Sequence, residues 1–117
     1  NNIKRNKIAS IYKLKLNQKN VKFIEYKKDF YNSYHLFVVR VKQRDKLVKY
    51  LKLNKIDILI HYKKPNHTHK SFKKYRTDRL INTNKYVKEI LSLPLYPDLK
   101  YKDQIKIIKT VNNFYKK

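Results

Sequence analysis

The sequence of 117 residues contains no glycine, no cysteine, no methionine and no tryptophan, and Ala9 is its only alanine. Without cysteine, a disulfide framework and metal sites built on thiolates are excluded. Without glycine, the phosphate-binding loops of the GxGxxG and GxxxxGK types are excluded, because their backbone requires that residue. Since an initiating methionine is also missing, we expect the chain to be a piece of a longer protein.

Long apolar runs are absent as well. None approaches the ~18 residues of a membrane-spanning helix, so we expect no membrane association. Together with the lack of cysteine and of a secretory signal, this favours a cytoplasmic protein. Hydrophobic residues make up 41% of the chain and charged residues 33%, a balance that allows a buried core. The length suits one domain, residues 1–117.

Acidic residues are few: the sequence has 8 of them and 31 basic residues, which gives a net charge of +23. Of the basic residues 26 are lysine and 5 are arginine, whereas base readout and bidentate phosphate binding favour arginine. Lysine, asparagine, isoleucine and tyrosine all have A/T-rich codons, so a biased genome would produce this excess. We therefore expect only weak, nonspecific, salt-sensitive binding to nucleic acid. A small basic nucleic-acid-binding module is the alternative function, supported by tyrosine–lysine interleaving in "KKYR" and "HYKK".

Hydrophobic periodicity predicts an α+β fold. The expected helices span 3–16, 44–53, 83–91 and 101–115, with one helical turn expected at 71–75, and the expected strands span 21–25, 34–41 and 56–61. The strand at 34–41 is apolar on both faces, which favours a central place. We expect a small antiparallel or mixed three-stranded sheet with helices packed mainly on one face. Asn17, Asn20 and Asn54 are the candidates for left-handed positions that glycine would otherwise fill.

The stretch "HYKKPNHTHK" at 61–70 gathers three of the four histidines, His61, His67 and His69. Asp57 is the one carboxylate nearby and the spacing is not that of a zinc site, so we expect no metal. No nucleophile stands in a recognisable motif, and we expect no catalytic residue in this chain. The fourth histidine, His35, lies in the expected central strand and is interpreted as a core residue.

Several segments in order resemble the C-terminal part of the DegT/DnrJ family. These segments are "KRNKIASIYKLKL", "SYHLFVVRVKQRDKLVKYLKLNKI", "LIHYKKPNHTH" and "EILSLPLYPDL", followed by the closing helix. The family consists of pyridoxal-phosphate-dependent sugar aminotransferases. The resemblance implies the small C-terminal domain of a fold-type I aminotransferase, with 1–17 as the interdomain helix and 18–117 as the α+β layer.

The resemblance also implies an activity for the longer protein. It would transfer an amino group, usually from glutamate, to a nucleotide-linked keto-sugar, in amino-sugar or surface-polysaccharide biosynthesis. Such enzymes are generally homodimers. The Schiff-base lysine and most groups that hold pyridoxal phosphate belong to the large domain, which this chain lacks. We therefore expect no cofactor-binding residue here and no activity from this piece alone.

Three residues match the family's substrate-side loop, namely His61, Tyr62 and His67, and the resemblance implies that they bind substrate. Imidazole and phenol groups suit contacts with sugar hydroxyls or a diphosphate. Two positions depart from the family pattern. Lys63 stands where the family has proline, and Lys55 stands where it has glycine, so that Asn54 is the expected left-handed residue.

Overall fold

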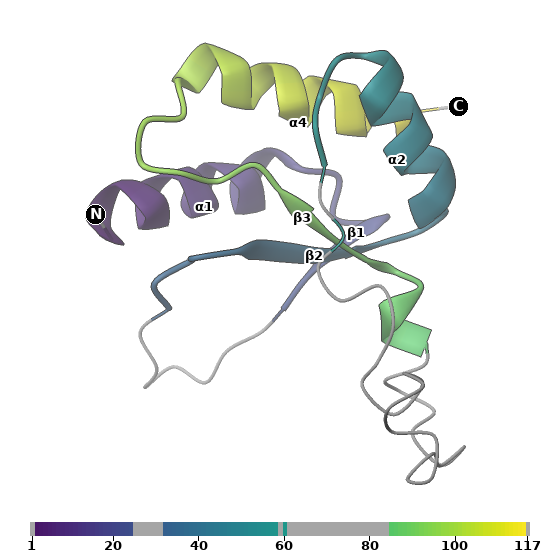
Figure 1. Ribbon diagram of the computed structural model, residues 1–117, viewed down its shortest axis with the longest axis horizontal. Coiled ribbons are helices and arrows are strands. Elements are labelled where there is room, and N and C mark those ends of the chain that lie inside the picture. Colours follow the sequence, from purple (N-terminus) through teal and green to yellow (C-terminus); the bar gives the residue numbers. More distant parts are fainter. Residues whose placement is uncertain (1, 25–31, 59, 61–84, 117) are drawn as a thin grey trace, which may run out of the picture.

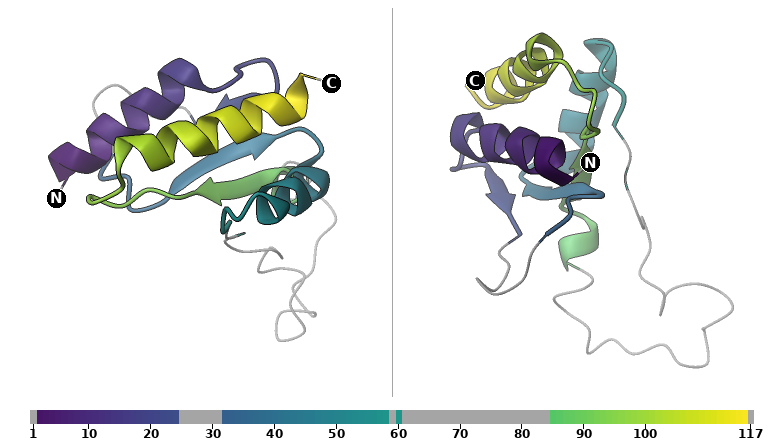
Figure 2. Two further views of the ribbon diagram at one scale, coloured as in Figure 1. Left: turned by 90° about the horizontal axis from the view of Figure 1, so that it is seen from above. Right: turned by 90° about the vertical axis from the view of Figure 1, so that its left-hand side faces the viewer.

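The structure is a computed structural model, and it describes residues 2–24, 32–58, 60 and 85–116. Its elements follow the order α1 (Asn2–Lys15), β1 (Val21–Phe23), β2 (Phe37–Val41), α2 (Arg44–Leu53), β3 (Ile90–Leu93) and α4 (Tyr101–Tyr115). The three strands form one antiparallel sheet in the order β1–β2–β3. Helices α1, α2 and α4 lie on the same side of that sheet (Figures 1 and 2). The predicted fold class is confirmed.

Strand β2 is central, as its apolar character predicts. Its residues pair with β1 from Val21 opposite Val41, and with β3 from Phe37 opposite Leu93. Burial alternates along it, because only the face toward the helices is fully covered. Antiparallel sheets tolerate such a half-covered face.

The helices bury the stripes that their apolar spacing predicts. In α1 the buried side chains are Ile8, Ala9 and Tyr12. In α2 the apolar stripe is Leu47, Val48 and Leu51, and in α4 it includes Ile107, Ile108 and Val111. Together with the inner face of the sheet these residues form one hydrophobic core. The Tyr12 ring stacks on the Phe37 ring at a centroid distance of 5.1 Å, which joins α1 to the sheet.

Asparagine side chains connect the ends of the elements. Asn112 of α4 accepts from the Asn17 N–H at 2.8 Å and donates to the Lys15 carbonyl at 2.9 Å. It thereby satisfies polar backbone groups at the end of α1. Asn17 in turn accepts through its side chain from the Lys19 N–H at 3.0 Å. The prediction that Asn17 and Asn20 are left-handed is wrong, because the non-glycine residues with positive φ in the described segments are Tyr34, Gln43 and Lys55.

The third strand was predicted in the wrong place. The expected strand 56–61 is not one at its described positions, 56–58 and 60, although Ile56 and Ile58 are buried and Asp57 is exposed. The sheet edge is taken by β3, whose first two residues, Ile90 and Leu91, fall within the helix expected at 83–91. Residues 85–87 are helical, but the helix cannot extend through 90–93 because β3 pairs with β2.

Pro94 gives the physical reason. It directly follows β3, and proline disfavours the helical conformation in the residue before it. The alternation of apolar and polar residues at 56–60 correctly predicts that Ile56 and Ile58 are buried. It does not predict that β3 is the strand that completes the sheet. The residues 71–75, expected to form one helical turn, lie outside the described residues. Within the described ranges no helix is both long enough and apolar enough to cross a membrane.

Candidate functional site

The three predicted substrate-binding residues, His61, Tyr62 and His67, lie outside the described residues, as does His69. The structure does describe the segment that leads to them. Ile56 and Ile58 are 6% and 7% exposed, so this segment is anchored in the core just before the histidine-containing stretch. The described walls beside that segment form the candidate site.

A hollow of about 780 Å³ lies next to the segment 56–58, and we call it the apolar hollow. Its walls are the start of β2 with the two residues before it, the end of α2 with 55–58, the segment from Ser92 to Tyr96, and the first half of α4. Apolar side chains such as Phe37, Leu93 and Ile107 contribute to the lining, together with polar groups such as Asp57 and Tyr96. A concave, largely apolar surface with a few polar groups is the usual form of a small-molecule site.

His35 is placed differently from the prediction. It is exposed rather than buried, it precedes β2, and it lines the apolar hollow. The reason is a turn just before the strand, where the Asn32 side chain accepts from the Tyr34 N–H at 2.8 Å and Tyr34 has φ 49°. An asparagine whose side chain accepts a hydrogen bond from the backbone N–H two residues later is a known turn signal, so the asparagine of "NSY" could have indicated this turn. The interpretation of His35 as a core histidine is therefore wrong.

Tyr12 fixes the wall formed by Pro94 to Tyr96. Its hydroxyl donates to the Pro94 carbonyl at 2.7 Å, and the side chain is 0% exposed. Burial, and to a lesser degree the nearby Tyr96, raises the pKa of the Tyr12 phenol far above its usual range. The phenol therefore stays protonated at neutral pH and remains a hydrogen-bond donor. Its contribution to the site is to position the wall, not to exchange a proton.

Lys55 shapes the opposite wall. It has φ 61°, whereas Asn54 has φ −91°, so the expectation that Asn54 is the left-handed residue is wrong. The Lys55 N–H bonds to the Lys52 carbonyl and the Ile56 N–H to the Leu51 carbonyl, both at 3.0 Å. These two bonds define a Schellman motif, with the left-handed residue directly after the helix cap. The lysine thus adopts the conformation that the family's glycine would adopt.

The described residues do not make a site for a metal or for pyridoxal phosphate. No group of three histidine or acidic residues that could hold a metal occurs among them. A Schiff-base lysine is typically desolvated, but every lysine in the described segments is exposed or half-buried. The described residues therefore do not fit the cofactor. The hollow can bind a polar molecule through its rim groups and cover the molecule's apolar face.

The comparisons with known proteins agree with one another. The family model of the DegT/DnrJ/EryC1/StrS aminotransferase family matches residues 1–112. A "Pleiotropic regulatory protein" of Geobacillus stearothermophilus is 32% identical over 88 residues, which is 74% of this chain and 24% of that protein. A dTDP-3-amino-3,6-dideoxy-alpha-D-galactopyranose transaminase of Aneurinibacillus thermoaerophilus is 32% identical over 81 residues, 69% of this chain and 22% of that protein.

Solved structures give the same result. An aminotransferase of this family from Brucella abortus has a TM-score of 0.89 at 30% identity, covering 97% of this chain and 31% of that one. DesV of S. venezuelae has a TM-score of 0.93 at 26% identity, covering 99% of this chain and 32% of that one. The chain spans about a quarter of the length of the curated relatives that it matches. The chain belongs to the DegT/DnrJ/EryC1/StrS aminotransferase family.

Proposed function

We propose that this chain is the C-terminal part of a pyridoxal-phosphate-dependent enzyme that transfers an amino group to a nucleotide-linked keto-sugar. The observation that carries the proposal is the family match over residues 1–112, together with the names of the relatives. Two of them are transaminases of dTDP-linked amino sugars. Glutamate is the proposed amino donor, and amino-sugar or surface-polysaccharide biosynthesis the proposed context.

The cofactor is assigned to the part of the protein that lies outside this chain. Pyridoxal phosphate supplies the electron sink for moving the amino group when it is bound. The exposure of the described lysines supports this division, because none of them has the desolvated surroundings of a Schiff-base lysine. We therefore propose that the isolated chain is inactive. Membership of the family supports the further proposal that the longer protein acts as a homodimer.

The share of this chain in the reaction is to contact the sugar substrate. The proposed contacts are His61, Tyr62 and His67, which follow the anchored segment 56–58 in the sequence. That segment also lines the apolar hollow, whose rim carries His35 and Tyr96. Both kinds of ring offer hydrogen bonds of fixed direction to hydroxyl or phosphate oxygens.

Substitution in the full-length protein tests this proposal. His61→Ala and His67→Ala should each lower kcat/KM for the nucleotide-sugar about ten- to a hundred-fold, because a hydrogen bond to a charged group contributes about 1.5–3 kcal/mol. The half-reaction with glutamate should be nearly unchanged, since it does not involve the sugar. Stopped-flow absorbance of each half-reaction separates the two effects.

His69→Ala is the matched control, because His69 stands outside the family motif, and it should change neither half-reaction. Equal losses in both half-reactions for His61→Ala and His67→Ala would contradict a role in sugar binding. A full-length protein that does not aminate any nucleotide-linked keto-sugar would contradict the proposed function itself.

A further inference from the structure

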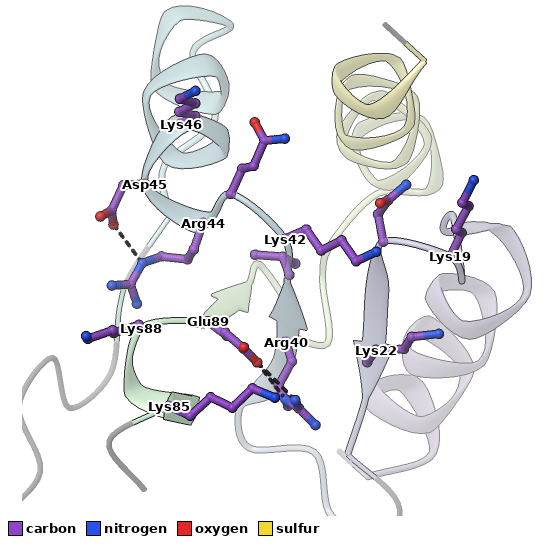
Figure 3. A pocket seen from close by; sticks show the side chains of 13 residues that line it. Lys19, Lys22, Arg40, Lys42, Arg44, Asp45, Lys46, Lys85, Lys88 and Glu89 are labelled. Carbon is purple, nitrogen blue, oxygen red and sulfur yellow. Dashed lines mark hydrogen bonds and ion pairs between the residues drawn. The ribbon is translucent and has the colours of Figure 1, made fainter. Parts of the chain in front are cut away.

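A second hollow lies at the other end of the sheet, and we call it the basic hollow. Its volume is about 650 Å³. Its walls are the residues around the start of β1, the end of β2, the first turn of α2, and residues 85–89 (Figure 3). The charged residues that line it are Lys19, Lys22, Arg40, Lys42, Arg44, Asp45, Lys46, Lys85, Lys88 and Glu89. None of the residues proposed to contact the sugar belongs to it.

The positive charge here exceeds what the composition of the chain would give. Eight of the 13 lining residues are lysine or arginine, against 31 of 117 in the whole chain. The apolar hollow, in contrast, has three lysines and two aspartates in its lining. Codon bias explains an excess of lysine over the whole sequence, but it does not explain why basic residues gather around one of two hollows.

Both carboxylates of the basic hollow are already paired. Glu89 Oε2 accepts from the Arg40 guanidinium at 3.0 and 3.1 Å. Asp45 Oδ1 accepts from Arg44 Nε at 2.8 Å. Arg44 is 8% exposed and also donates to the Val87 carbonyl at 2.9 Å. The two arginines therefore hold the walls together, and the lysines supply the charge that is not neutralised.

The side-chain ammonium groups of five of these lysines make no hydrogen bond or ion pair within the part of the chain that the structure describes, although four of these residues bond through the backbone. The five are Lys19, Lys42, Lys46, Lys85 and Lys88. In Figure 3, Lys42 extends from the end of β2 toward the start of β1, and Lys85 lies beside the Arg40–Glu89 pair, whereas the Lys88 side chain points away from that pair. Like charges around one concavity raise the local potential and attract anions. The first turn of α2 forms part of the wall, and its N–H groups add to the positive field.

The lining indicates what kind of anion fits. Val41 is the one apolar residue in it. The Tyr86 ring nearby is covered by the Arg40 guanidinium, whose central carbon lies 4.0 Å from the ring centroid. No aromatic residue is among those that line the hollow in the described part of the chain, so its walls offer a nucleobase no stacking surface of the kind that single-strand binding proteins use. Lysine ammonium groups are mobile point charges, which suits an anion with several charges in a small volume.

We propose that the basic hollow binds small, multiply charged phosphate anions of diphosphate or triphosphate size, recognised by their charge and not by a base. This proposal does not rest on the aminotransferase activity, because it involves other residues and the opposite end of the sheet. The same phosphate chemistry could come from an inorganic polyphosphate or from the diphosphate of a nucleotide. Binding should weaken steeply with salt, since the contacts are electrostatic.

Two variants of equal net charge test the proposal in the 117-residue chain. The first, Lys42→Gln with Lys85→Gln and Lys88→Gln, removes three charges from the basic hollow. The matched control, Lys7→Gln with Lys102→Gln and Lys109→Gln, removes three exposed charges elsewhere. Calorimetric titration with tripolyphosphate at about 50 mM salt should give a Kd raised about tenfold in the first and less than about twofold in the control. Equal losses in both variants would overturn the proposal, because the binding would then follow net charge alone.

Amide chemical shifts of the unsubstituted chain give a test that does not depend on how the variants fold. Tripolyphosphate should shift amides at 40–46 and 85–89 and leave those of α1 nearly unchanged. If a nucleoside diphosphate shifts the same amides and its nucleoside does not, the result supports a nucleotide as the source of the phosphates. If tripolyphosphate shifts these amides and the nucleoside diphosphate does not, the result supports an inorganic polyphosphate. Shifts spread over the whole surface, or shifts at these residues with a single-stranded oligonucleotide but not with tripolyphosphate, would overturn the proposal.

Discussion

Lys55 takes a backbone conformation that glycine adopts without cost. A left-handed residue with a Cβ atom is disfavoured by about 1 kcal/mol or more. The next residue requires this conformation at position 55. Ile56 packs into the core and its N–H bonds to the Leu51 carbonyl, and both are possible only when the residue directly before it is left-handed. The burial of Ile56 therefore makes residue 55 left-handed whatever its side chain, although asparagine at position 54 would tolerate that conformation better.

Glycine at position 55 should consequently stabilise the protein. We expect Lys55→Gly to raise the free energy of unfolding by about 0.5–1 kcal/mol, since the strain relieved exceeds the entropy that glycine adds to the unfolded chain. Urea unfolding measures the change. Lys49→Gly is the control, because Lys49 is an exposed residue inside α2, and this change should lower the free energy by about 1 kcal/mol. A loss of stability in Lys55→Gly would contradict the left-handed assignment.

At the scale of elements, α2 and β3 are tied together by one arginine. Arg44 Nη1 donates to the Val87 carbonyl at 2.9 Å and to the Ile90 carbonyl at 3.0 Å. These carbonyls lie where the helical residues 85–87 give way to β3. A buried carbonyl without a donor is costly, so the guanidinium stabilises the turn that starts the strand.

Replacing that guanidinium should loosen the start of β3. We expect Arg44→Met, which keeps the length of the side chain, to lower the free energy of unfolding by about 2–3 kcal/mol. Hydrogen exchange should then accelerate at 89–93 more than in α4, because the loss is local. Lys46→Met removes a neighbouring exposed charge and should change stability by less than about 0.5 kcal/mol. Uniform acceleration over all elements would contradict a local role for Arg44.

The elements differ in how far the sequence predicts them. Helices α1, α2 and α4 and strand β2 follow from local periodicity, because each buries a regular stripe of its own residues. Strand β3 does not, since its place beside β2 depends on a pairing across about fifty residues that no local pattern contains. The segment 56–58 shows the same limit. Its alternation correctly predicts that Ile56 and Ile58 are buried, but it also predicts a strand, and the structure has none at these residues.

At the scale of the whole molecule, the site was only partly predictable. Motif resemblance identifies His61, Tyr62 and His67, and these remain predictions. The apolar hollow could not be found from sequence, because His35, Asp57 and Tyr96 belong to three distant segments that only folding brings together. The basic hollow could not be found from the sequence either, for a different reason. In a chain with 31 basic residues no local run of lysines is unusual, and only their arrangement in space sets them apart.

The net charge of +23 also predicts how the whole chain responds to salt. With 31 basic and 8 acidic side chains, most charge–charge interactions in the folded state are repulsive, and folding brings these charges closer together. Of the ion pairs described, Lys4 with Asp98 is 3.9 Å long and exposed, and such pairs contribute little. The balance of surface electrostatics therefore opposes folding.

Screening should stabilise the fold as a result. Between about 20 and 200 mM sodium chloride the screening length falls severalfold, and we expect the free energy of unfolding to rise by about 1 kcal/mol, or Tm by about 4 °C. Differential scanning calorimetry measures this. Potassium chloride at the same ionic strength should give the same curve, because screening depends on charge and concentration and not on the identity of the cation. A Tm that falls with added salt would mean that attractive pairs outweigh the repulsion among the lysines, and would contradict the expectation that their charge opposes folding.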